Sequence, residues 1–113
     1  MNYKNETFFI ANFSIRELRQ TRVFSSKQEC EEFIIKQICD SIIKEINTRD
    51  QIIILFDRYF KLHHCECCKV DRYIFDKLPS TINEAIEISK CYGPYSNYQG
   101  DPFLYNIYEH KPE

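Results

Sequence analysis

The spacing of apolar residues changes along the chain, and each change predicts a different element. In residues 7–16, Phe9, Ala11, Phe13 and Ile15 occupy every second position. This period is typical of a strand with one buried face. A second short strand is expected over residues 21–24, after a charged turn at residues 17–19.

The segment of residues 27–46 has helical spacing. Ile34, Ile38 and Ile42 recur every four residues, which predicts one apolar helix face. Ser26 and Glu29 fit a capping box, in which the Ser26 hydroxyl accepts a hydrogen bond from the amide of Glu29. Cys30 and Cys39 lie nine residues apart on this helix, on nearly opposite faces, and both are expected to be small core residues.

Three further segments complete the pattern. Residues 52–60 fit either a buried strand or a helix, and their aromatic spacing together with a cap at residues 48–51 favours the helix. A cap at residues 81–84 predicts a short helix that ends before Gly93 and Pro94. We expect that helix to be lined by Ile82, Ala85, Ile86 and Cys91. Residues 103–110 alternate as a final strand, apolar on much of both faces.

These elements predict a single α+β domain spanning residues 1–113. The plan is a small antiparallel sheet formed by the N- and C-terminal strands, with two or three helices packed on one face. A chain of 113 residues with 43% apolar side chains can bury a core without disulfides or metal ions.

Composition and charge then limit the functional classes. The net charge is −2, which disfavours nucleic acid as a partner. No apolar run approaches the length of a membrane span, and the N-terminus lacks the features of a signal peptide. We therefore expect no membrane partner, an intracellular protein that is not secreted, and six reduced cysteines.

The sharpest motif is HHCECC at residues 63–68. Cys65 and Cys68 have the spacing with which two thiolates reach one zinc ion, and His63 or His64 would add a nitrogen ligand. The second ligand pair is missing, since Cys91 and His110 are isolated. We expect no tightly bound metal and no cofactor; the alternative is a zinc-stabilised interaction module built around residues 63–68.

The sequence offers less support for a redox, nucleophilic or phosphate-binding site. The flanks of Cys65 and Cys68 lack the strand-to-helix junction of redox dithiols, and a catalytic pair of Cys65 with His64 would join sequence neighbours. No phosphate-binding loop or hydrolase motif is present. Arg16, Arg19, Arg22 and Lys27 form a local basic cluster, which is expected to be a charged turn. Six aromatic residues crowd residues 92–108, and they either form a partner surface or cap the core. Since no catalytic motif is assembled, we expect a non-enzymatic protein that binds another macromolecule, most simply a protein.

Two segments resemble known proteins. RVFSSKQECEEFIIKQI, which follows the first strand, and the closing YNIYEH are similar to segments of small uncharacterised proteins of large DNA viruses and phages. The likeness covers residues 8–33 and 103–110. The abundance of residues with AT-rich codons resembles that of amoeba-infecting giant viruses. The resemblance implies a compact α+β unit and a viral source, with the host cytoplasm as its location, and it assigns no catalytic residues.

Overall fold

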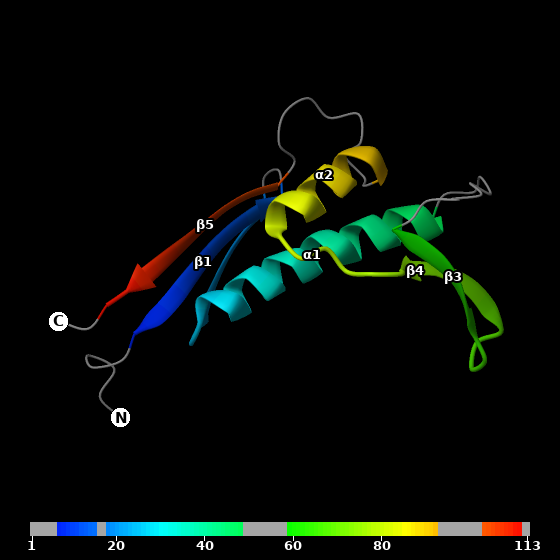
Figure 1. Ribbon diagram of the computed structural model, residues 1–113, viewed down its shortest axis with the longest axis horizontal. Helices are drawn as coiled ribbons and strands as arrows, with labels where there is room; N and C mark the ends of the chain where they lie inside the picture. Colours follow the sequence, from blue (N-terminus) through cyan, green and yellow to red (C-terminus); the bar gives the residue numbers. More distant parts are fainter. Residues whose placement is uncertain (1–6, 16–17, 49–58, 93–102, 112–113) are drawn as a thin grey trace.

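The structure is a computed structural model, which describes residues 7–15, 18–48, 59–92 and 103–111. In these residues the elements are, in chain order, β1 (Phe8–Ile15), β2 (Leu18–Phe24), α1 (Lys27–Thr48), β3 (Phe60–Cys65), β4 (Val70–Phe75), α2 (Ile82–Tyr92) and β5 (Phe103–His110). The molecule is elongated, with extents of 55 × 36 × 22 Å, and the sheet and the β3–β4 hairpin lie at its two ends (Figure 1). Neither described helix is both long enough and apolar enough to cross a bilayer.

The main sheet has three antiparallel strands in the order β2-β1-β5. Phe8 of β1 is paired with His110 of β5, and Ile10 is paired with both Val23 and Tyr108. Ala11 and Phe13 are buried on the face toward α1, as the period of two predicts. The predicted sheet made from both ends of the chain is therefore confirmed, with β2 three residues longer than expected.

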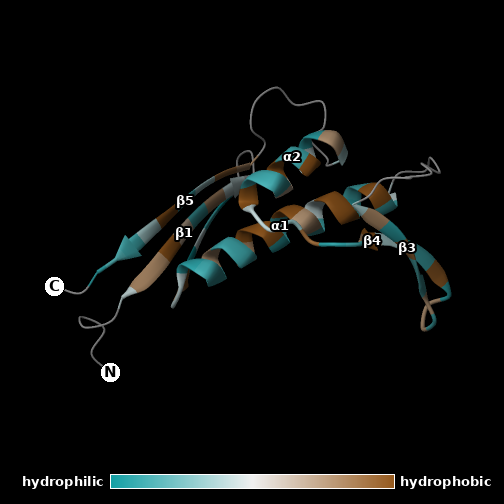
Figure 2. Ribbon diagram, viewed as in Figure 1, coloured by the Kyte–Doolittle hydropathy of each residue, from teal (hydrophilic) through white to brown (hydrophobic). Residues whose placement is uncertain are grey.

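Helix α1 is the centre of the core. The amide of Glu29 donates to Ser26 Oγ at 3.2 Å, which confirms the predicted cap. The helix contacts all three strands of the sheet, β4 and α2, and hydrophobic and hydrophilic residues alternate along it (Figure 2). Its buried residues are Cys30, Ile34, Ile35, Ile38, Cys39, Ile42 and Ile46. These positions span about half of the helix circumference at 3.6 residues per turn, because α1 is covered on more than one side.

Helix α2 begins where the sequence predicts. The amide of Glu84 donates to Thr81 Oγ1 at 3.1 Å. The predicted lining is wrong for Cys91, which is exposed, because nine residues from Ile82 place it on the opposite side of the helix. Helix α2 packs chiefly on α1. The expected packing of two or three helices on one face of the sheet is therefore not confirmed.

Strands β3 and β4 form a separate antiparallel hairpin, which we call the hairpin arm (residues 60–75). Phe60 is buried at its base, where its ring lies 4.9 Å from Phe75 and 5.2 Å from Tyr92. The helix favoured for residues 52–60 falls mostly outside the described residues, and Phe60 itself belongs to β3. The arm projects from the end of α1 that is remote from the main sheet (Figure 1).

Candidate functional site

The clustered histidines and cysteines lie on the hairpin arm. His63, His64 and Cys65 are the last residues of β3, and a turn of residues 66–69 leads into β4. Residues 63–68 are therefore strand in their first half and turn in their second half. The segment lacks a strand-like alternation because residues 61–64 are all exposed, so that neither face of the strand has to be apolar.

The turn brings Cys65 and Cys68 together. The amide of Lys69 donates to the Cys65 carbonyl at 2.8 Å, and Lys69 has the left-handed φ of 56° that closes the turn. Hydrogen bonds to the Cys65 sulfur come from the Cys68 thiol and from the backbone amides of Cys68 and Cys67, and they lower the pKa of the Cys65 thiol below its ordinary value. The turn thus favours a thiolate at Cys65 with a second sulfur beside it.

The two histidines are separated by the pleat of the strand. His63 shares a face with Cys65, whereas His64 lies on the other face, where its Nδ1 is 2.7 Å from Asp71 Oδ1 on β4. In the described ranges no three His, Cys, Asp or Glu side chains come together as a metal site. Of the four candidate ligands, the structure therefore joins Cys65 with Cys68 only, and His64 is turned away from Cys65 as a catalytic base.

The other cysteines differ sharply in environment. Burial and the nearby Asp40 carboxylate raise the pKa of the Cys39 thiol to about 12, and burial with Glu29 and Glu31 raises that of Cys30. Both thiols are in the core, as expected from the helix pattern. Such thiols are poor nucleophiles, so chemistry at sulfur is confined to the cysteines outside the core.

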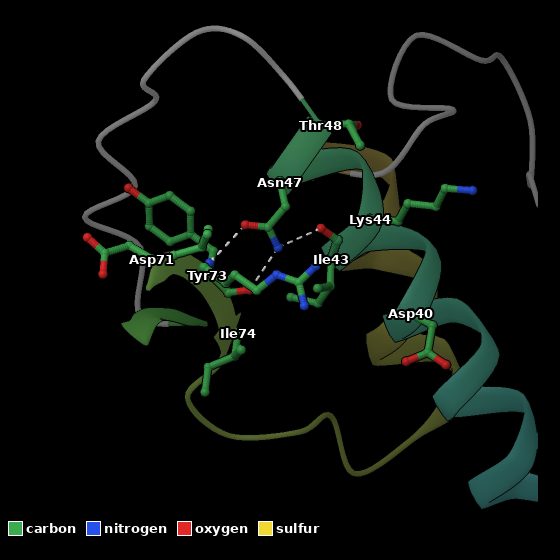
Figure 3. A pocket seen from close by; sticks show the side chains of 10 residues that line it. Asp40, Ile43, Lys44, Asn47, Thr48, Asp71, Tyr73 and Ile74 are labelled. Carbon is green, nitrogen blue, oxygen red and sulfur yellow. Dashed lines mark hydrogen bonds between the residues drawn. The ribbon is translucent and has the colours of Figure 1, made fainter. Parts of the chain in front are cut away.

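A pocket of about 450 Å³ lies between the C-terminal half of α1 and β4 (Figure 3). Asn47 bridges its two walls, because its Oδ1 accepts from the Tyr73 amide at 2.9 Å while its Nδ2 donates to the carbonyls of Tyr73 and Ile43, each at 3.0 Å. One side chain thus pairs with β4 much as a neighbouring strand would. No cysteine or histidine lines the described walls of this pocket. The hydrogen bonds of Asn47 across the pocket anchor the hairpin arm to α1. The role of Asn47 was not predictable from local sequence pattern, because its partner Tyr73 is 26 residues away.

The face of the main sheet that points away from α1 has a distinct apolar region. Val23, Ile10 and Tyr108 are cross-strand neighbours on this outer face, and Phe8 stacks on His110 beside them with ring centroids 4.3 Å apart. We call these five residues the apolar stripe. Val23 is 61% and Tyr108 52% exposed, so both present large apolar surfaces to solvent.

A shallow depression of about 430 Å³ adjoins the apolar stripe. Asn12, Ser14 and Asn106 are among the residues that line it, together with the exposed side chains of Arg19 and Leu104. The outer face therefore combines apolar area with side-chain amides and a hydroxyl, the mixture found at many protein interfaces.

The predicted basic cluster is dispersed. Arg19 lies on the outer face, and Arg22 lies opposite Ala11 on the inner face. Lys27 pairs with Glu31 at 3.9 Å on α1, and Arg16 is outside the described residues. These three described cations therefore form no single patch.

The comparisons with known proteins add no relative from which a role could be transferred: no protein family model, curated protein or solved structure matches this chain.

Proposed function

We propose that this protein is non-enzymatic and acts by binding another protein through the outer face of its main sheet. The observation that supports the proposal is the apolar stripe, which crosses all three strands in register and which no described element covers. A sheet face that remains exposed is normally polar on its outer side. Here Val23, Ile10 and Tyr108 occupy successive strands instead, and apolar side chains gathered in this way typically mark an interaction surface.

The side chains of the outer face favour a protein as the partner. Arg19 is the single Lys or Arg among its described positions, whereas nucleic acids are bound through several phosphate-neutralising cations. Tyr108 and the Phe8–His110 stack offer rigid aromatic area with polar tips, which is enriched at protein interfaces.

The position of the core favours this function over a zinc-stabilised fold. The described core is formed by the main sheet, α1, α2 and the base of the hairpin arm, at a distance from residues 63–68. We extend the proposal to a viral source and an intracellular site of action, on the strength of the resemblance in residues 8–33 and 103–110 and of six cysteines that are all free thiols.

A photo-crosslinking experiment tests the proposal. A crosslinking amino acid placed at Val23 or at Tyr108 in the full chain, expressed in host cells, should join one recurrent protein partner. The control position is Leu78, which is 64% exposed and also apolar but lies outside the sheet. The same partner should be absent from the Leu78 sample.

A matched pair of variants gives the decisive comparison. The double variant Val23→Thr with Tyr108→Thr keeps good strand-forming residues and removes most of the exposed apolar area of the stripe. The double variant should retain its melting temperature and lose binding to the partner. Leu78→Thr should still bind the partner. Crosslinks only to a second copy of the chain, or equal binding by both variants, would contradict the proposal.

A further inference from the structure

The hairpin arm is anchored at its base and exposed at its tip. Its base is anchored by Phe60 in the core and by the hydrogen bonds of Asn47 to Tyr73. Beyond the base, residues 61–64 and 70–72 are all exposed. The tip therefore stands at the end of the molecule remote from the main sheet, where it is free to meet another molecule (Figure 1).

The tip presents two sulfur atoms on one turn. Cys65 is the last residue of β3, and Cys68 lies in the turn of residues 66–69, which is closed by the hydrogen bond from the Lys69 amide to the Cys65 carbonyl at 2.8 Å. Two cysteines separated by two residues on such a tight turn have the spacing with which two thiolates bind one zinc ion.

One chain provides only half of a tetrahedral site. All cysteines and histidines of the sequence fall within the described residues, and among those residues no third His, Cys, Asp or Glu joins Cys65 and Cys68. His64 is held by Asp71 on the opposite face of the arm, and His110 stacks on Phe8 in the main sheet. A zinc ion held by Cys65 and Cys68 would therefore need its remaining ligands from another molecule.

We propose that the arm tips of two copies of this chain bind one zinc ion through Cys65 and Cys68 of each copy. Four thiolates give the tetrahedral all-sulfur shell typical of structural zinc. Binding one Zn²⁺ to four thiols releases four protons, so the assembly is weakened as the pH falls. Because the tip is remote from the described core, zinc joins the two chains without being required for either to fold.

The tip of the hairpin arm is a different surface from the apolar stripe, so zinc binding there is independent of the proposed function. It also separates two roles for zinc: a metal that stabilises one domain would need all its ligands from one chain, whereas a bridging metal needs two chains.

Zinc titration of the full chain tests this inference. Protein purified with a phosphine reductant and a chelator, then freed of chelator, should be a monomer of 13.7 kDa in sedimentation analysis. Addition of ZnCl₂ should double the mass at one zinc per two chains, and a chelator should reverse the change. Cobalt(II) in place of zinc should give the absorption of a tetrahedral thiolate complex. The melting temperature of the monomer should not depend on the chelator.

Cysteine variants provide the controls. Cys65→Ser and Cys68→Ser should each abolish the zinc-dependent dimer, whereas Cys91→Ser should retain it, because Cys91 is an exposed thiol on α2 away from the tip. Cys67→Ser should also retain it, since Cys65 and Cys68 supply the proposed ligands and their spacing is unchanged. A monomer that binds one zinc per chain, a dimer that survives Cys65→Ser, or a failure to bind zinc would overturn the inference.

Discussion

One exposed side chain, that of Asn47, contributes hydrogen bonds to the attachment of the hairpin arm to α1, and Asn47→Ala should weaken this attachment. The substitution removes the three hydrogen bonds that Asn47 makes with Tyr73 and Ile43, which are 2.9–3.0 Å long. A protein hydrogen bond contributes about 0.5–1.5 kcal/mol net, and the lower end applies at this exposed position. Alanine recovers about 0.5 kcal/mol through its higher helix propensity. Three bonds at about 0.5 kcal/mol each, less the gain in helix propensity, should lower the free energy of unfolding by about 1 kcal/mol.

Two measurements check this value. Urea denaturation gives the change in the free energy of unfolding, and hydrogen exchange followed by NMR shows whether the Tyr73 amide loses its protection. Asn47→Asp keeps the oxygen that accepts from the Tyr73 amide but loses the donor, so its Tyr73 amide should stay better protected than in Asn47→Ala.

The matched control for Asn47 is Asn83→Ala, the same substitution at an exposed position of α2. It should leave the Tyr73 amide as in the unmodified chain. If Tyr73 exchange is the same in Asn47→Ala and Asn83→Ala, the anchoring role of Asn47 is refuted, whatever happens to the overall stability.

Three further predictions concern the core and the thiols. Ile38→Ala should lower the free energy of unfolding by about 2–5 kcal/mol in urea titrations, because Ile38 is fully buried in α1; a change within experimental error would refute its burial. Folding raises the pKa of the Cys39 thiol from 9.0 to about 12, so the folded state keeps this proton to a higher pH. Between those pH values the free energy of unfolding should fall with rising pH, by up to about 1.4 kcal/mol per pH unit more steeply than in Cys39→Ala. Parallel pH profiles would contradict this. In metal-free protein at neutral pH, iodoacetamide should modify Cys65 before Cys91, as peptide mass mapping will show, because hydrogen bonds lower the pKa of the Cys65 thiol; this prediction fails if Cys91 is labelled faster.

The parts of the fold that the sequence predicted are those set by local chemistry. Both helix starts were predicted from capping pairs, because a capping hydroxyl reaches an amide only three residues away. The pairs are Ser26 with Glu29 and Thr81 with Glu84. The burial of Ile38 followed from the repeat of apolar residues at helical spacing.

The hairpin arm could not be predicted in the same way. Strand prediction uses the contrast between a buried and an exposed face, and residues 61–64 have no buried face. The spacing of Cys65 and Cys68 was visible in the sequence. The turn that joins their sulfurs, and the separation of His63 from His64, depend on strand pairing and on the left-handed Lys69.

The central position of β1 in the main sheet determines when its two neighbouring strands can pair with it during synthesis. β1 is paired on one side with β2, which follows it closely, and on the other with β5, whose first residue is Phe103. A nascent chain can therefore form the β1–β2 pair and α1 early, while the second edge of β1 stays open until β5 has left the ribosome. During that interval neighbouring nascent chains on one message expose the same open edge, and each can accept a strand from another. The shorter the delay between the synthesis of β2 and that of β5, the less time this edge of β1 is open to such pairing.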